Sequence, residues 1–103
     1  MTVTKATDQE VQAAIGELGS WRVKEGRLHR EFLFQDFVQA FGFMTQAALV
    51  AERGNHHPEW SNVYNRVVVE LTTHEAGGIT EKDLKLARQM EQIASSMSLL
   101  VSR

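Results

Sequence analysis

The stretch Glu52–Thr73, which reads ERGNHHPEWSNVYNRVVVELTT, decides the fold because it joins the end of a helix to an antiparallel hairpin. Gly54 stops the helix. The segment up to Pro58, the single proline of the chain, cannot continue it, because a residue before proline is pushed towards extended geometry. A short strand is expected over residues 60–63. The stretch therefore predicts a sharp change of direction between a helix and a strand.

The hairpin continues with a second strand over residues 66–73, where side chains alternate with the period of two that a strand requires. One side carries Val67, Val69, Leu71 and Thr73, and the other carries Val68, Glu70 and Thr72. The pair Tyr64-Asn65 is expected to make the turn, because asparagine tolerates a positive φ.

Helices are predicted on both sides of this hairpin. The preceding helix covers residues 36–53, and its expected inward face is Phe37, Ala40, Phe41, Met44, Ala48 and Ala51, widened by Phe43 and Val50. The last helix begins at Thr80, with Asp83 three residues on, after the Gly77-Gly78 break. Its expected inward residues are Leu84, Ala87, Met90, Ile93, Ala94, Met97 and Val101.

The N-terminal third predicts a helix followed by a hairpin. Thr7 and Glu10 have capping-box spacing, and Gly19 is placed to end the helix. Its apolar stripe is Val11, Ala14, Ile15 and Leu18. Two strands are expected around residues 21–24 and 28–35, joined by a turn at Glu25-Gly26; Arg30 breaks the alternation of the second.

The element order is therefore α-ββ-α-ββ-α, which predicts an α+β fold. Two hairpins make a four-stranded antiparallel sheet, and helices with one apolar face must cover one side of it, giving two layers. The chain of 103 residues is expected to be one domain, 1–103.

Composition excludes several classes of function. The net charge of −2 does not favour direct nucleic-acid binding, and the absence of cysteine excludes disulfides and thiol chemistry. No apolar run approaches the roughly 20 residues of a membrane span. The N-terminus has no apolar signal segment, so a cytoplasmic protein is expected.

Three histidines stand beside sharp changes of chain direction. His56 and His57 follow a helix end, and His74 follows a strand end. Histidine suits proton transfer near neutral pH, although three surface histidines near turns is an alternative interpretation. Adjacent histidines in an extended segment point apart, and the chain lacks HExxH, so no metal site is expected.

Four further side chains have two interpretations each. Trp60 and Tyr64 are either strand or core residues, or an aromatic wall for a flat ligand. Glu52 is either a solvated helix-end residue or a ligand contact. Asp83 either caps the last helix or faces a ligand.

The sequence ERGNHHPEWSNVYN followed by VELTTHEAGGITEKD resembles the pterin-4a-carbinolamine dehydratase family. This resemblance implies a four-stranded antiparallel sheet with helices on one side. It also implies dehydration of 4a-hydroxytetrahydropterin to quinonoid dihydropterin, without a cofactor, in the recycling of the pterin of aromatic amino acid hydroxylases.

The resemblance also implies the site residues. The family's active-site histidines fall on His56, His57 and His74. Its neighbouring ligand-site positions fall on Glu52, Asn55, Trp60, Thr73, Glu75 and Asp83. Animal members often carry aspartate where this chain has Asn55. One histidine acts as acid and another as base, and the sequence does not assign the two roles. Carboxylates such as Glu52 or Asp83 are expected to orient an imidazole or to accept hydrogen bonds from ring N–H groups.

The family forms dimers or tetramers, and its animal members also bind a homeodomain transcription factor. A homo-oligomer is therefore expected here, with the last helix as the contact, because Leu86, Leu99 and Leu100 extend its apolar surface. Two other functions stay open: a dimerisation or binding module for a protein partner, and a dehydratase-like protein acting on another pterin.

Overall fold

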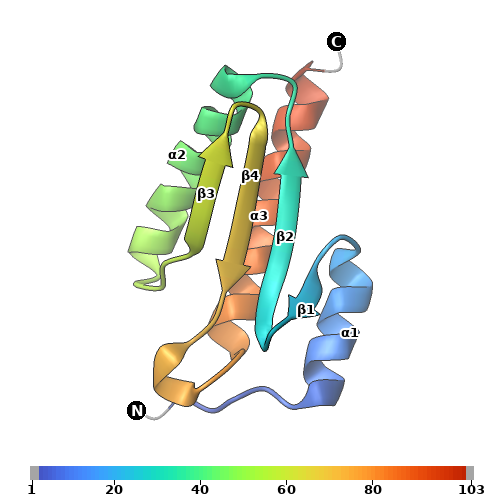
Figure 1. Cartoon of the computed structure of the whole chain (residues 1–103), viewed down its shortest axis with the longest axis vertical. Helices are drawn as coiled ribbons and strands as arrows, with labels where there is room; N and C mark the ends of the chain where they lie inside the picture. Colours follow the sequence, from blue (N-terminus) through green and yellow to red (C-terminus); the bar gives the residue numbers. More distant parts are fainter. Residues whose placement is uncertain (1–2, 102–103) are drawn as a thin grey trace.

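The computed structural model describes residues 3–101, with side chains described up to residue 97. The elements, shown in Figure 1, follow the order α1 (Asp8–Leu18), β1 (Arg22–Lys24), β2 (Arg27–Leu33), α2 (Phe37–Arg53), β3 (Glu59–Val63), β4 (Arg66–Leu71), the 3-10 turn η1 (His74–Ala76) and α3 (Glu81–Val101).

The four strands form one antiparallel sheet in the order β1-β2-β4-β3. Figure 1 shows the sheet in front, with α2 and α3 behind it and α1 beside β1. The predicted two-layer α+β fold is therefore confirmed. One face of the sheet packs on the helices, and we call the other, which no helix covers, the open face.

The ends of α1 form as predicted. The Thr7 side chain accepts from the backbone N–H of Glu10, and the Glu10 carboxylate accepts from the N–H of Thr7, which completes the capping box. Gly19 has φ 80 and donates its N–H to the carbonyl of Ile15. Local sequence signals thus set both ends of this helix.

The predicted inward face of α2 is wrong in part. The buried side chains are Ala40, Phe43, Ala47 and Ala51, whereas Phe37, Phe41 and Ala48 are exposed. Residues 37–51 contain no charged side chain and three polar ones, Gln39, Thr45 and Gln46, so apolar residues spread widely around the helix and their periodicity does not mark the buried face. Packing on the sheet selects the alanine side, which lets the two backbones approach closely.

The inward residues of α3 are largely as expected. Leu84, Ala87, Met90 and Ala94 are buried, Ile93 and Met97 are partly buried, and the Val101 side chain lies outside the described residues. Leu86 is 3% exposed, so it belongs to the core and does not extend an exposed apolar surface, contrary to expectation. The side chains of Leu99 and Leu100 also lie outside the described residues.

The β3–β4 turn uses a different residue from the one predicted. Tyr64, not Asn65, has the positive φ, of 52. The Asn65 side chain instead donates to the carbonyl of Phe34 at 3.0 Å, and Phe34 donates its N–H back to the Asn65 carbonyl at 2.8 Å. The asparagine therefore ties the hairpin tip to the chain that leaves β2.

The structure explains why Arg30 interrupts the alternation of β2. Its Nε donates to Glu91 of α3 at 2.6 Å, and the same carboxylate oxygen accepts from Trp21 Nε1 at 2.8 Å. The guanidinium lies 4.0 Å above the ring centroid of Phe32. Arg30 thus lies on the helix side of the sheet, with its charge paired and its stem packed.

Among the described residues, no helix has the length and apolar character needed to cross a membrane.

Candidate active site

His56 is placed by the sharp end of α2. Asn55 adopts a left-handed conformation with φ 51, and the N–H of His56 bonds to the carbonyl of Ala51 at 3.1 Å. This geometry turns the imidazole towards the first turn of α3. There, His56 Nε2 lies 2.5 Å from Asp83 Oδ1. The helix end that the sequence predicts is therefore what brings His56 to Asp83.

Asp83 is fully buried, and both of its carboxylate oxygens lie within hydrogen-bond distance of a partner. Its Oδ2 accepts from the Thr73 hydroxyl at 2.8 Å and from the backbone N–H of Thr80 at 2.9 Å. The Thr73 and Thr80 hydroxyl oxygens are 2.8 Å apart. Because the single proton of Thr73 goes to the carboxylate, the Thr80 hydroxyl donates to Thr73. A buried charge that is hydrogen-bonded in this way holds His56 in one orientation.

The loop between β4 and α3 presents His74. Thr73 and Gly78 pair as an antiparallel bridge, so the intervening residues form a small closed loop that contains η1. Gly77 has φ 74, which favours glycine. The His74 side chain is 75% exposed, and its Nε2 lies 2.9 Å from Glu59 Oε2 at the start of β3.

His57 makes the third pair, with Glu52 in the last turn of α2. The distance from His57 Nε2 to Glu52 Oε1 is 2.9 Å, and both side chains are exposed. All three candidate histidines therefore engage a carboxylate through Nε2. In a neutral imidazole this places the proton on Nε2 and leaves Nδ1 as an acceptor.

The Glu59 carboxyl has a pKa below its ordinary value of 4.5, chiefly because it accepts the hydrogen bond from His74. Desolvation raises this pKa as the second-largest effect, and the positive charge of Arg27 and its hydrogen bond lower it. The carboxylate is therefore ionised at neutral pH, as the pairing with His74 requires.

A cavity of about 360 Å³ adjoins His56, between the C-terminal end of α2 and the first half of α3. Val50, Ala51 and Leu86 supply apolar side chains to its wall. Its polar lining is made up of Arg53, Gly54, His56, Lys82, Lys85 and Gln89. No carboxylate lines it, so its charged side chains are all positive. This volume lies in the range of small-molecule sites.

The remaining predicted site residues lie in different surroundings. Asn55 and Glu75 are exposed, whereas Thr73 is buried behind His56. Trp60 is half-buried and packs against the core. Tyr64 is 61% exposed at the hairpin tip, five residues along from Glu59, about 17 Å at strand spacing. It stands at the opposite end of β3 from Glu59, the partner of His74, and the aromatic wall of Trp60 and Tyr64 stays a prediction.

Sequence reasoning missed several residues that the fold brings to this site. Glu59 lies within the quoted stretch but was read only as part of it, and Arg27, its partner, is 32 residues away. Lys82 and Lys85 are spaced to share one face of α3, a signal that the sequence offers. Among the described residues, no group of three or more histidine and acidic side chains gathers as a metal site would require.

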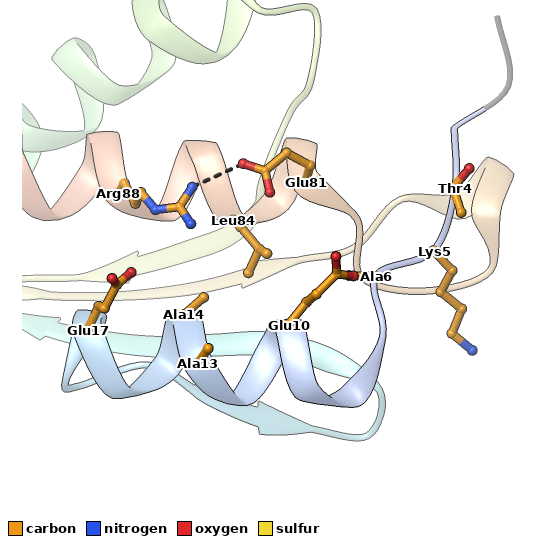
Figure 2. A pocket seen from close by; sticks show the side chains of 10 residues that line it. All are labelled: Thr4, Lys5, Ala6, Glu10, Ala13, Ala14, Glu17, Glu81, Leu84 and Arg88. Atoms are coloured by element: carbon orange, nitrogen blue, oxygen red, sulfur yellow. Dashed lines mark hydrogen bonds and ion pairs between the residues drawn. The ribbon is translucent and has the colours of Figure 1, made fainter.

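A second cavity, of about 430 Å³, lies apart from these residues between α1 and α3 (Figure 2). Figure 2 shows Glu10 and Glu17 on α1 facing Leu84 and Arg88 on α3. Arg88 donates to Glu81 at 3.1 Å. No predicted site residue lines this cavity, so it is not part of the candidate active site.

Comparison with known proteins gives consistent matches. A family model described as pterin 4 alpha carbinolamine dehydratase matches residues 4–93. A protein of Solibacter usitatus, provisionally named a pterin-4-alpha-carbinolamine dehydratase, is 56% identical over 92 residues, covering 89% of this chain and 97% of the relative. One of Rhodopseudomonas palustris strain BisB18 with the same name is 52% identical over 98 residues, covering 93% and 97%.

A solved structure agrees in fold and sequence. The crystal structure described as transcriptional coactivator/pterin dehydratase from Brucella melitensis is 50% identical, with a TM-score of 0.85, and the match covers 88% of this chain and 99% of that one. The family model and the relatives each span most of the chain, which confirms the resemblance read from the sequence. The chain therefore belongs to the pterin-4a-carbinolamine dehydratase family.

Proposed function

We propose that this chain removes water from a pterin 4a-carbinolamine by acid–base catalysis with His56, His57 and His74. The reaction itself follows from family membership and makes the chain a hydro-lyase. The bond from C4a to the hydroxyl oxygen breaks as one imidazole protonates the departing hydroxyl. Another imidazole accepts a ring N–H proton as the quinonoid system forms, so the products are quinonoid dihydropterin and water. Each such proton transfer is worth about 10²–10⁴-fold.

The observation that carries this mechanism is the pairing of all three histidines with carboxylates through Nε2. A carboxylate partner fixes the orientation and tautomer of an imidazole, and stabilises its protonated form during a transfer. The three Nδ1 atoms have no hydrogen-bond partner among the described residues, which leaves them available to a substrate.

The cavity beside His56 is the proposed seat of the pterin ring; of the predicted site residues, His56 alone is among the residues that line it. Its apolar wall suits a flat heterocycle, and its polar rim supplies hydrogen-bond donors. The exposed polar side chains Glu52, Asn55 and Glu75 are proposed to contact the substrate directly. Thr73 and Asp83, being buried, are proposed to act through His56, and Trp60 is proposed to border the site from β3.

The test is a direct assay. Freshly made 4a-hydroxytetrahydropterin is mixed with purified protein, and the quinonoid product is followed by absorbance against buffer. If the protein accelerates formation of the quinonoid product and the rate saturates with substrate, the proposed dehydration is supported. No acceleration over buffer would exclude the dehydratase function and favour the alternative, a protein-binding module.

We further propose that the enzyme acts in the cytoplasm, recycling the pterin of an aromatic amino acid hydroxylase.

One observation favours a pterin with an anionic side chain as an additional substrate. Arg53, Lys82 and Lys85 line the cavity together and form no ion pair among the residues whose side chains are described. A phosphate group would find three cations within one cleft. Comparing kcat/KM for phosphorylated and unphosphorylated substrates tests this preference, and equal values would contradict it.

We also propose that the chain forms a homo-oligomer through α2, not through the last helix. Val38, Phe41 and Leu49 are 79%, 57% and 63% exposed and lie on the side of α2 opposite the buried alanines. From Val38 to Leu49 this face is uncharged, and a soluble monomer rarely exposes such a stripe. A second copy offers an identical uncharged face through a two-fold axis, which makes the contact self-complementary.

A further inference from the structure

Charged side chains cross the open face of the sheet as one connected network. Basic and acidic side chains alternate along the network, and the described contacts run in the order Arg66, Glu31, His29, Glu70, Arg27, Glu59 and His74. This face is turned towards the viewer in Figure 1. The network ends on a histidine of the candidate active site.

The strand register explains why the network forms. His29 pairs with Glu70 across β2 and β4, and Glu70 pairs with Glu59 across β4 and β3. Two carboxylates directly opposite each other on neighbouring strands repel. Arg27 Nη1 bonds to both of them, at 2.5 Å to Glu59 and 3.4 Å to Glu70. The guanidinium therefore permits this arrangement and fixes where each carboxylate lies.

His29 lies within the network, between Glu31 and Glu70. It is 4% exposed although no helix covers its face of the sheet. Its Nδ1 lies 3.0 Å from Glu70, and its Nε2 lies 3.4 Å from Glu31. Glu70 is thus held from two sides, by His29 and by Arg27.

Glu59 is held in two directions in the same way. Its Oε1 accepts from Arg27, and its Oε2 faces His74 Nε2 at 2.9 Å. The His74 side chain is largely exposed, and within the described residues Glu59 is its single hydrogen-bond partner. The orientation of this imidazole therefore depends on Glu59.

We propose that Glu59, held by Arg27, is the positioning residue of His74: it keeps the proton of the neutral imidazole on Nε2 and presents Nδ1 to the substrate. The importance of this for catalysis rests on the proposed function, in which His74 transfers a proton. Glu59 itself does not touch the substrate.

The matched control for Glu59 is Glu31. Both are exposed carboxylates on the same face of the sheet, and each accepts from one histidine and pairs with one arginine. Glu31 has no contact with a candidate catalytic residue. Glu59→Ala and Glu31→Ala therefore remove similar interactions at different distances from His74.

The test uses the protein labelled with ¹⁵N in its histidines. NMR of the imidazole nitrogens reports which nitrogen of His74 carries the proton, and a His74→Gln variant assigns the signals. We expect the Nε2–H tautomer in the unmodified protein and in Glu31→Ala, and a mixture of tautomers in Glu59→Ala. We expect Glu59→Gln, which keeps an acceptor oxygen, to restore the Nε2–H tautomer.

Kinetics give the second measurement. In Glu59→Ala, kcat should fall on the order of tenfold with KM within about twofold, because the loss lies in proton transfer and not in binding. Glu31→Ala should keep its kcat. An unchanged His74 tautomer in Glu59→Ala would overturn the proposal. A changed tautomer in a protein that shows no dehydration at all would support the positioning and overturn the proposed function instead.

Discussion

The imidazole of His56 lies 2.5 Å from a carboxylate, that of Asp83, which is completely buried. The same carboxylate closes the first turn of α3 by accepting from Thr80 and joins β4 to that helix through Thr73. One side chain therefore supports both the fold and the orientation of a candidate catalytic group. Its removal should affect both.

Asp83→Ala is expected to lower the free energy of unfolding by about 3 kcal/mol, because it leaves the buried Thr73 hydroxyl and Thr80 N–H, and the partly buried His56 imidazole, without their acceptor. Its dehydration rate should also fall, since His56 loses its anchor. Urea unfolding followed by circular dichroism measures the first effect. Glu81→Ala, on the same turn but exposed, is the control and should stay within about 0.5 kcal/mol of the unmodified protein. Equal stability of the two variants would contradict the structural role.

His57→Ala and His74→Ala should each reduce the dehydration rate at least about tenfold, because each removes a proton-transfer group. Both side chains are exposed, at 55% and 75%, so the free energy of unfolding should change by less than about 0.5 kcal/mol. Initial rates and thermal unfolding check the two statements. Tyr64→Ala, at the far end of β3, should keep its rate. Normal rates in both histidine variants would mean that the site lies elsewhere.

The local parts of this structure could be read from sequence, and the non-local parts could not. The Thr7 capping box and the end of α2 at Gly54 depend on neighbouring residues, and both form as predicted. The buried face of α2 depends on what packs against it, and its uncharged sequence does not mark that face. The same distinction applies to the site, where the family resemblance named the histidines together with Glu52 and Asp83, but not Glu59, the partner of His74.

Glu59, the partner of His74, was missed because the fold alone brings the two residues together. His74 and Glu59 are separated by 15 residues, and His56 and Asp83 by 27. The sequence offers Asp83 three roles, as a helix cap, as a ligand contact and as a carboxylate that orients an imidazole. The structure supports the cap and the orientation of His56, because full burial keeps this carboxylate behind the imidazole.

Acid should weaken the fold partly through the open face of the sheet. Hydrogen bonding by His29 chiefly lowers the pKa of Glu31, with Arg66 adding to it, and hydrogen bonding by His74 chiefly lowers that of Glu59, both from an ordinary value of 4.5. A carboxyl whose folded-state pKa is depressed stabilises the fold above its unfolded pKa. That contribution is lost as the pH falls from about 4.5 through the folded-state value.

The urea concentration at the unfolding midpoint should therefore decrease as the pH is lowered below 4.5. The decrease should be less steep in a Glu31→Gln/Glu59→Gln double variant, which lacks both titrating groups. Midpoints measured at several pH values between 3 and 6 test this. If the plots of urea midpoint against pH were parallel for the two proteins, these carboxyls would not contribute to the loss of stability in acid.

Assembly should depend on the exposed face of α2. Phe41→Glu places a charge in the centre of the proposed contact and should convert the oligomer to monomer, because an unpaired carboxylate in an apolar interface is costly to desolvate. Light scattering at high protein concentration measures the mass. Val23→Glu, at a partly exposed apolar position on β1, is the control and should leave the mass unchanged. A monomeric unmodified protein would rule out the proposed assembly.

Catalysis is expected to be independent of metal. The three histidines direct Nε2 at three different carboxylates and so form separate pairs, not one convergent set of ligands. Proton transfer near neutral pH needs only imidazoles, and the dehydration involves no change of redox state. The contrary case is a zinc ion that gathers the histidines and Glu75, since zinc sites use such ligands.

Chelation separates these two cases. The protein is treated exhaustively with a chelator, metal removal is confirmed by elemental analysis, and the dehydration rate is measured again. An unchanged rate supports the histidine mechanism, because carboxylate partners alone then suffice to hold the imidazoles. Loss of activity that added zinc restores would make His56, His57 and His74 metal ligands. In that case their pairing with Asp83, Glu52 and Glu59 would describe only the metal-free protein.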